Sequence, residues 1–257
     1  MSDNKGVTNA MPAESGHWYD RATGEPRYRI VGKNGVERNT TLRDARVHGY
    51  APSVTTVLQA AAKPGLERWK ANQVLMAALT LPRLPDEAED AWVSRVWEDS
   101  KQQAIKAAER GTAIHAAIEQ VLRGEPCDSE FQPYVDAALE CIDAKFPPPQ
   151  PWEPEKSFAC EMGYGGKVDL HAAGLVLDIK TKDGDVGAQK VWDEHMMQLA
   201  AYSHGLGMDE AGCGIVFVSR TQAQATLMML QPDEVKRGWS MFEALLEYWY
   251  AQSGLAR

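Results

Sequence analysis

The sequence predicts a mixed α/β (α+β) fold, in which helices flank a central β-sheet and a helical N-terminal portion precedes it. Apolar runs bounded by turn residues favour five strands in the second half of the chain. A helical pattern at 192–206 separates the third strand from the fourth. Apolar residues at helical spacing occupy much of the first half. The five strands are expected at about 154–162, 166–172, 174–180, 213–219 and 224–230.

The N-terminal portion is expected to begin with strands and to continue with helices. Residues 17–47 favour short strands, with turns at 22–26 and 33–35. Ser53 is a suitable N-cap for a short helix that ends near 63–65.

Longer helices are expected on both sides of the sheet segment. The first spans 66–80 and ends before the prolines of 81–85. The second spans 86–123 and ends at Gly124, a residue type suited to a C-cap. Two more are expected at 129–145 and 232–252, and the proline-rich residues 146–151 predict an extended connector.

A chain of 257 residues with 44% hydrophobic side chains can bury a sizeable core. We expect a disordered tail over residues 1–16 and one domain over 17–257. Within it, 17–100 form an N-terminal hairpin and helical portion and 101–257 form the core, although the length also allows two small domains. No apolar run approaches the roughly 20 residues that cross a bilayer, and no secretory signal is evident.

The most informative segment is the predicted hairpin that contains Asp169 and the sequence Asp178-Ile179-Lys180. Side chains alternate along a strand, so Asp178 and Lys180 share one face and Ile179 points to the other. Two carboxylates and a lysine on one hairpin suit a hard divalent cation and a developing phosphorane charge. An exposed edge hairpin with a solvated Asp–Lys face is the alternative.

Other candidate residues lie on neighbouring elements. His115 and Glu119 are one turn apart on a predicted helix, and Gln198 and Tyr202 are one turn apart on another. Glu155 lies on the strand before the hairpin. Taken singly, each has an ordinary interpretation: a partly buried helical histidine, packing on a helix face, or a surface glutamate.

In this order, the segments resemble the PD-(D/E)XK nuclease superfamily, in particular its RecB-like branch, which includes the mitochondrial genome maintenance exonuclease and phage-encoded relatives. The resemblance covers about residues 50–220. The segments that carry it are Pro52 to Leu58, Leu66 to Lys70, Gly111…His115, Glu155, Gly166…Asp169, Asp178-Ile179-Lys180-Thr181 and Gln198…Tyr202.

The resemblance implies a restriction-endonuclease-like core and a metal-dependent DNA exonuclease. Asp169, Asp178, the backbone carbonyl of Ile179 and His115 would hold Mg²⁺ or Mn²⁺. Lys180 would orient the attacking water or stabilise transition-state charge, and Glu155 would support the catalytic site or a second metal. Our own inference adds Glu119, which would hold the tautomer of His115 or help bind a second metal. Gln198 and Tyr202 would position the nucleotide or brace the Asp178 strand, and Thr181 would contact nucleic acid.

A net charge of −9 is unusual for a protein that binds nucleic acid, but binding depends on local patches. Basic and aromatic residues mix near the N-terminus, and Trp18, Arg27 and Arg29 are candidate contacts to single-stranded nucleic acid. The alternative is a solvated hairpin whose aromatic residues pack inward. The expected partner is DNA, single-stranded or with free ends, in phage or cellular replication, recombination or repair. Whether a single-strand binding or recombination protein also binds stays open.

The four cysteines are widely spaced and include no Cys-x-x-Cys pair. This spacing disfavours a zinc knuckle and a disulfide framework and favours a reducing compartment, so we expect a cytoplasmic protein, in the bacterial host if phage-encoded. Some RecB-like nucleases carry an iron–sulfur cluster on one upstream and three clustered downstream cysteines. This chain lacks that arrangement, so we expect no iron–sulfur cluster.

Three other functions remain open at this stage. The same fold also serves structure-specific endonucleases, and a catalytically inactive nucleic-acid-binding module is a further alternative. A zinc hydrolase that uses His115 and His171 is disfavoured because no His-Glu-x-x-His spacing is present.

Overall fold

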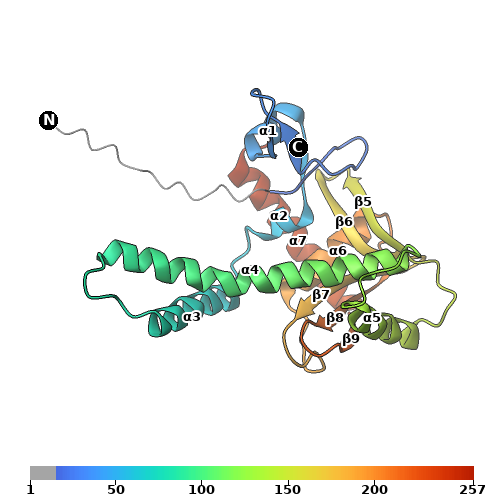
Figure 1. The fold of residues 1–257 in the computed structure, drawn as a ribbon. Helices are drawn as coiled ribbons and strands as arrows, with labels where there is room; N and C mark the ends of the chain where they lie inside the picture. Colours follow the sequence, from blue (N-terminus) through green and yellow to red (C-terminus); the bar gives the residue numbers. More distant parts are fainter. Residues whose placement is uncertain (1–15) are drawn as a thin grey trace.

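A computed structural model describes residues 16–257 (Figure 1). Residues 1–15, most of the tail expected from the sequence, lie outside the described residues. The centre is a five-stranded sheet in the order β5-β6-β7-β8-β9. Its strands are β5 (Glu153–Cys160), β6 (Tyr164–Ala172), β7 (Leu175–Lys182), β8 (Gly212–Ser219) and β9 (Ala225–Met229).

The sheet is mixed: β7 and β8 are parallel, and the other neighbouring strands are antiparallel. The helix α6 (Asp193–Gly205) crosses from β7 to β8, as a parallel connection requires. The β6–β7 pairing extends only from the turn at Gly174 to the pair Leu170–Leu177, whereas β7 remains paired with β8 as far as Lys182. The sheet therefore splits between β6 and β7.

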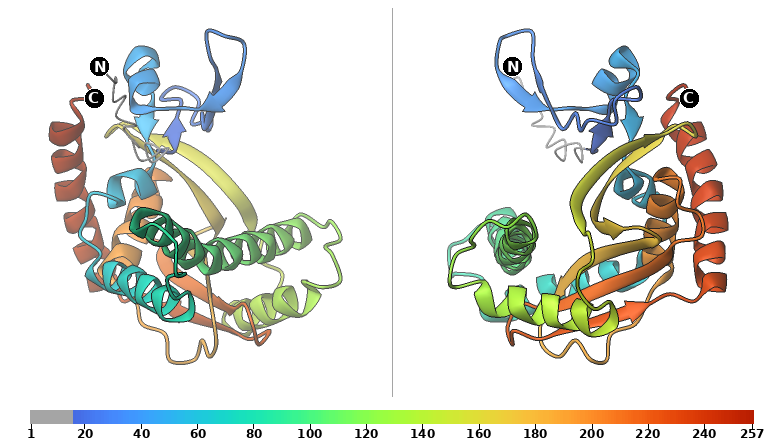
Figure 2. Two further views of the ribbon diagram at one scale, coloured as in Figure 1. Left: turned by 60° about the vertical axis from the view of Figure 1, so that its left-hand side comes forward. Right: turned by 90° about the vertical axis from the view of Figure 1, so that its right-hand side faces the viewer.

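Helices cover both faces of the sheet, as Figure 2 shows. On one face α4 (Glu89–Leu122) and α5 (Gln132–Lys145) pack on β7, β8 and β9. On the other face lie α6, α7 (Pro232–Ser253) and the short α2 (Val54–Leu58). This confirms the expected fold class, a central mixed sheet flanked by helices.

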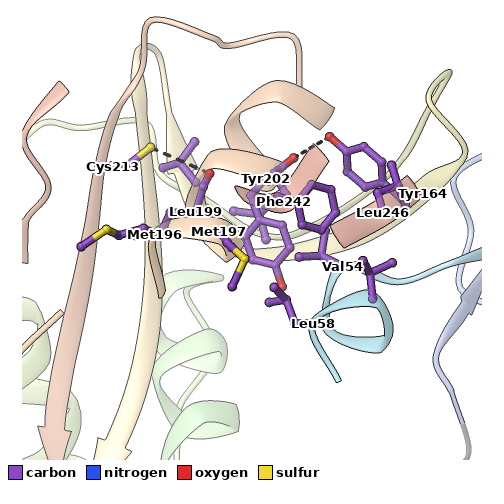
Figure 3. Packing of buried hydrophobic residues seen from close by; sticks show 14 of the residues in the cluster. Val54, Leu58, Tyr164, Met196, Met197, Leu199, Tyr202, Cys213, Phe242 and Leu246 are labelled. Carbon is purple, nitrogen blue, oxygen red and sulfur yellow. Dashed lines mark hydrogen bonds between the residues drawn. The ribbon is translucent and has the colours of Figure 1, made fainter. Parts of the chain in front are cut away.

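The second face holds the larger apolar core (Figure 3). Tyr164, at the start of β6, packs edge-on against Phe242 of α7 and donates a hydrogen bond to the carbonyl of Ala201 over 3.0 Å. Trp18 and Ala45, from the N-terminal portion, belong to the same buried cluster. The N-terminal segments are thus held by the core that α6 and α7 build.

The N-terminal portion contains small paired strands and two short helices. β1 (Trp18–Tyr19) pairs with β4 (Ala51–Pro52), and β2 (Arg29–Val31) pairs with β3 (Glu37–Asn39). The remaining elements there are α1 (Leu42–His48), α2 and α3 (Pro64–Thr80). In Figures 1 and 2, α3 and the first half of α4 lie side by side and project away from the sheet.

The expected elements from Ser53 onward are present, and the Ser53 hydroxyl caps its helix by accepting a hydrogen bond from the amide of Thr56. That helix ends at Leu58, however, earlier than the expected end near 63–65. The expectation of strands alone over 17–47 is wrong at its end, where α1 forms. Thr41 and Asp44 make a reciprocal capping box, and Ala45 is fully buried beneath the helix. The capping box and the burial of Ala45 favour a helix there more than the weak alternation of the sequence favours a strand.

No helix of residues 16–257 combines the length and the apolar character needed to span a bilayer. Even α4, with 34 residues, carries charged side chains along its whole length.

The packing of α7 on α6 depends on Gly238. A Cβ at this position would overlap the backbone carbonyl group of Met196, which cannot move aside as a side chain could. We predict that Gly238→Ala lowers the free energy of unfolding by about 1–3 kcal/mol, as overpacking does. Denaturant unfolding followed by circular dichroism measures this change.

Gly65→Ala is the matched control because Gly65 also lies in a helix, with open space where its Cβ would be. Its unfolding free energy should stay the same or rise by up to about 1 kcal/mol. Equal stability of the two variants would contradict the close approach of α6 and α7.

Candidate active site

Asp169 occupies the point where β6 and β7 separate. Its Oδ2 atom accepts a hydrogen bond of 2.7 Å from the backbone amide of Ile179, a residue of β7 beyond the last β6–β7 pair. A carboxylate thus satisfies a main-chain donor that β6 no longer reaches. The split leaves room beside the sheet for the side chains of both strands.

Helix α4 approaches the split because residue 111 is a glycine. A Cβ there would lie 2.5 Å from the Oγ1 atom of Thr181 on β7, so a larger residue would require the Thr181 side chain or the helix to shift. One turn later His115 reaches β6, with its Nε2 atom 3.0 Å from Oδ2 of Asp169. This contact gives a physical reason for the Gly-x-x-x-His spacing.

Glu155 faces Asp169 across the β5–β6 pair. Its neighbours in β5, Pro154 and Lys156, pair with Leu170 and Val168, so Glu155 stands opposite Asp169 in the register. The backbone of Glu155 has φ = 60°, a conformation that costs a non-glycine residue about 1–3 kcal/mol. Such strain tends to lie at functional sites, and here it accompanies a carboxylate that is turned into the site.

Three potential metal ligands converge at this point. His115, Glu155 and Asp169 each offer one ligand atom, and these atoms lie within 4.8 Å of one another. They line a cavity of about 550 Å³ between α4 and the strands β5, β6 and β7. Two carboxylates and one imidazole, with space beside them for water and substrate, fit Mg²⁺ or Mn²⁺. The donor set therefore fits a divalent metal ion.

Asp178 lies behind the cavity wall and faces α6. Its Oδ1 atom accepts a hydrogen bond of 2.9 Å from Gln198, and its Oδ2 atom lies 2.8 Å from Nζ of Lys180. Gln198 also donates to the hydroxyl of Tyr202 over 2.9 Å. Only 3% of the Asp178 side chain is exposed, so both oxygens are committed to protein partners while Lys180 itself reaches the cavity.

The charges of the site shift the pKa values of its members. Burial acts to lower the pKa of His115, but Asp169 and Asp178 outweigh it and leave the pKa above its ordinary value. Burial acts to raise the pKa of Asp169, but His115, Lys180 and the amide of Ile179 hold it below its ordinary value. Burial raises the pKa of Asp178 to about 6, although Lys180 opposes this rise.

Several sequence-predicted residues come together here. Besides the three potential ligands, the cavity is lined by Ile179, Lys180 and Thr181, and Gln198 and Tyr202 stand behind it with Asp178.

Four other sequence-predicted residues lie elsewhere. Glu119 pairs with Arg123, one turn along α4, over 2.7 Å and does not line the cavity. Trp18 is 2% exposed, and its indole donates to the carbonyl of Thr40. The two arginines pair with nearby acids on the N-terminal segments, Arg27 with Asp20 and Glu25, and Arg29 with Glu37.

The sequence reasoning missed Lys167, which lines the cavity and forms an ion pair with Glu155. Its position already carried the signal, because residues two apart on one strand share a face and Lys167 precedes Asp169 by two. Two carboxylate–lysine pairs thus meet at the cavity: Glu155 and Lys167 both line it, whereas Lys180 lines it and pairs with Asp178 behind its wall.

No protein-family model matches this sequence, and neither does any curated protein. Among solved structures, a candidate exonuclease from Eubacterium rectale is 11% identical with a TM-score of 0.37, over 72% of this chain and 69% of that chain. The protein SSO0001 is 15% identical with a TM-score of 0.30, and the match covers 71% of this chain and 87% of that chain. An alkaline exonuclease from Laribacter hongkongensis is 14% identical with a TM-score of 0.29, and the match covers 73% of this chain and 98% of that chain. These low scores assign neither a family nor a reaction to this chain.

Lys167 should compete with a metal ion for the Glu155 carboxylate. We predict that Lys167→Met tightens Mn²⁺ binding by about 1.4- to 5-fold, which corresponds to the roughly 0.2–1 kcal/mol of a partly exposed ion pair. Isothermal titration of the metal-free protein with Mn²⁺ measures the change without any substrate.

Lys156→Met serves as the control, because it removes the same charge from the exposed side of β5, next to Glu155 in the chain. Its affinity for Mn²⁺ should equal that of the wild type. Unchanged or weaker binding by Lys167→Met would show that the lysine does not compete at the site.

Proposed function

We propose that this protein is a metal-dependent deoxyribonuclease that hydrolyses phosphodiester bonds, acting as an exonuclease on single-stranded DNA or on free ends. The observation that carries the proposal is the cavity in which His115, Glu155 and Asp169 converge beside Lys180. The order of the motifs, which resembles that of RecB-like PD-(D/E)XK nucleases, supports the same assignment. Residues 17–257 would then form one nuclease domain.

Asp169, Glu155 and His115 would hold Mg²⁺ or Mn²⁺. When bound, the metal ion lowers the pKa of a coordinated water and neutralises charge on the phosphate. Asp169 suits this role because both hydrogen bonds that it accepts from residues 16–257 end on Oδ2. Its Oδ1 atom therefore stays available as a ligand.

Asp178 and the carbonyl of Ile179 would complete the ligand set. In the structure Oδ2 of Asp178 is paired with Lys180, so Asp178 can join only when Nζ of Lys180 moves away. That movement would release the ammonium group, which already borders the cavity, to orient the attacking water or stabilise negative charge on the phosphate. Asp178 and Lys180 would thus either pair with each other, as they do in the structure, or separate, with Asp178 on the metal ion and Lys180 on water or phosphate.

Gln198 and Tyr202 are positioning residues in this proposal. The amide of Gln198 holds Oδ1 of Asp178, and its second contact to the Tyr202 hydroxyl fixes the amide orientation. Thr181 lines the cavity beside Lys180 and is placed to contact the substrate backbone. We assign no substrate contact to Trp18, Arg27 or Arg29, and no metal role to Glu119, since none lines the cavity.

The decisive test is cleavage of end-labelled linear single-stranded DNA, linear duplex and closed circular single strands, with Mg²⁺ and with Mn²⁺. We predict degradation of the linear substrates only, since an exonuclease needs an end. Lys180→Ala should lower the rate by about 10²–10³, as the loss of one electrostatic stabiliser does. The position of the retained label gives the polarity.

Lys182→Ala is the matched control, an exposed lysine on the same face of β7 that does not line the cavity. It should keep most of the activity. More than a few per cent of wild-type activity in Lys180→Ala would contradict the assigned role. Cleavage of the closed circle would indicate an endonuclease, and no cleavage by folded protein would favour a binding module.

A further inference from the structure

The N-terminal segment brings aromatic rings to the strand that carries the candidate site. A Cβ at Gly165 of β6 would lie 2.7 Å from the Cβ and Cγ atoms of Tyr19, so Tyr19 covers this glycine. Side chains alternate along a strand, so Gly165, Lys167 and Asp169 share one face of β6. Tyr19 therefore lies on the face whose next two side chains line the cavity.

Two further rings extend this contact toward solvent. The hydroxyl groups of Tyr19 and Tyr28 share a hydrogen bond of 2.6 Å, and the two rings meet edge-on. The ring of His17 lies over that of Tyr28, with 4.6 Å between the centroids and 34° between the planes. Tyr19 is buried, Tyr28 is half-buried and His17 is exposed. Solvent thus reaches the outer two rings, the His17–Tyr28 pair.

The backbone holds the His17–Tyr28 pair in place. The amide of His17 donates to the Oγ1 atom of Thr56 over 2.9 Å, and its carbonyl accepts from the amide of Ser53 over 2.8 Å. Ser53 in turn forms a β-bridge with Gly165. The pair is therefore ordered against β6 before any ligand arrives, and such preorganisation reduces the entropic cost of binding.

The His17–Tyr28 pair lies close to the cavity. Four residues of β6 separate Gly165 from Asp169, which is about 13 Å along the strand, and Lys167 stands between them. The right-hand view of Figure 2 shows the β2–β3 hairpin and α4 on the same side of β5 and β6. Partial burial and the nearby charge of Lys167 hold the pKa of His17 below its ordinary value, so its imidazole is uncharged at neutral pH. It presents the face of a ring, without a positive charge.

This combination matches the chemistry of a single nucleic-acid strand. Unpaired bases stack on aromatic side chains, and lysines along the same groove pair with the phosphates. Lys167 pairs with Glu155 in the structure, and a metal ion on that carboxylate would leave the ammonium group free for a phosphate. An aromatic surface followed by a lysine and then by the potential metal ligands thus follows one face of β6.

We propose that the His17–Tyr28 pair stacks a base of a single-stranded DNA substrate, a few nucleotides from the bond that is cleaved, while Lys167 pairs with a phosphate between them. The inference rests on the proposed function, since it takes DNA as the substrate. It adds a path for the strand, from Asp169 along β6 to the N-terminal segment. Stacking of this kind tolerates any base, because every base has a π-face.

The test is the affinity of the full-length protein for a fluorescent single-stranded oligonucleotide, measured by anisotropy. Ca²⁺ replaces Mg²⁺, and electrophoresis verifies that the DNA stays intact. His17→Ala should weaken binding about 5- to 150-fold, the loss that one base–aromatic stack gives. His17→Phe should recover most of the affinity, because it restores a ring. Circular dichroism checks that each variant is folded.

His48→Ala is the matched control. His48 is also exposed and stacks on a tyrosine, Tyr50, with 5.3 Å between the ring centroids. This second pair lies near the C-terminal end of the chain, since Arg21 donates both to the carbonyl of Gly49 and to that of Ala256. His48→Ala should bind the oligonucleotide as tightly as the wild type.

A series of oligonucleotides, each with one abasic site at a different distance from the end, identifies the stacked base. The wild type should lose affinity at one position by a factor similar to that of the His17→Ala substitution, and His17→Ala should lose no more there. Equal binding by His17→Ala and the wild type would overturn the proposal. So would a loss that His17→Phe does not recover, or an abasic site without effect at every position.

The cleavage assay separates this inference from the proposed function. A wild type that binds DNA through His17 but cleaves no substrate would refute the nuclease and retain the stacking contact. A wild type that cleaves DNA and binds it no better than His17→Ala does would retain the nuclease and refute the contact. A wild type that binds no DNA at all would overturn both.

Discussion

The hydrogen bond from the amide of Ile179 to the carboxylate of Asp169 is the interaction on which the candidate site depends. Strands β6 and β7 stop pairing after Leu170 and Leu177, and a main-chain donor would otherwise be left unsatisfied there. A side chain takes over the role of the partner strand. Consequently one carboxylate both holds the split sheet together and faces the cavity, where α4 can approach closely because residue 111 is glycine.

Charge compensation explains how so many ionisable groups can be gathered in one half-buried site. Glu155 is paired with Lys167, Asp178 with Lys180, and Asp169 with His115. Burying any of these carboxylates alone would be costly. A divalent cation would replace this compensation and release the lysines. Lys167 and Lys180 would then become available for phosphate or water, whereas His115 would join the ligands of the metal ion.

The molecule consists of a well-packed body, built around the central sheet, and an exposed arm, formed by α3 and the first half of α4. The body buries large side chains on both faces of the sheet, and its N-terminal strands are tied into the same core through Trp18. The arm has little core of its own, although its second helix continues directly into the cavity through His115. One continuous helix, α4, thus connects this projecting pair of α3 and the first half of α4 to the cavity.

The sequence by itself determined the fold class, nearly all the elements from Ser53 onward and many of the residues at or behind the cavity. Periodicity and turn residues act locally, and motif spacing assigns each side chain to an element and a face. Only the tertiary structure decided which of those faces are open. It buried Trp18, directed Asp178 toward Gln198, paired Glu119 with Arg123 and brought Lys167 to Glu155. Apart from the Glu119–Arg123 pair, these outcomes depend on partners distant in the chain. Residue spacing along one strand or helix cannot show what packs against it from elsewhere.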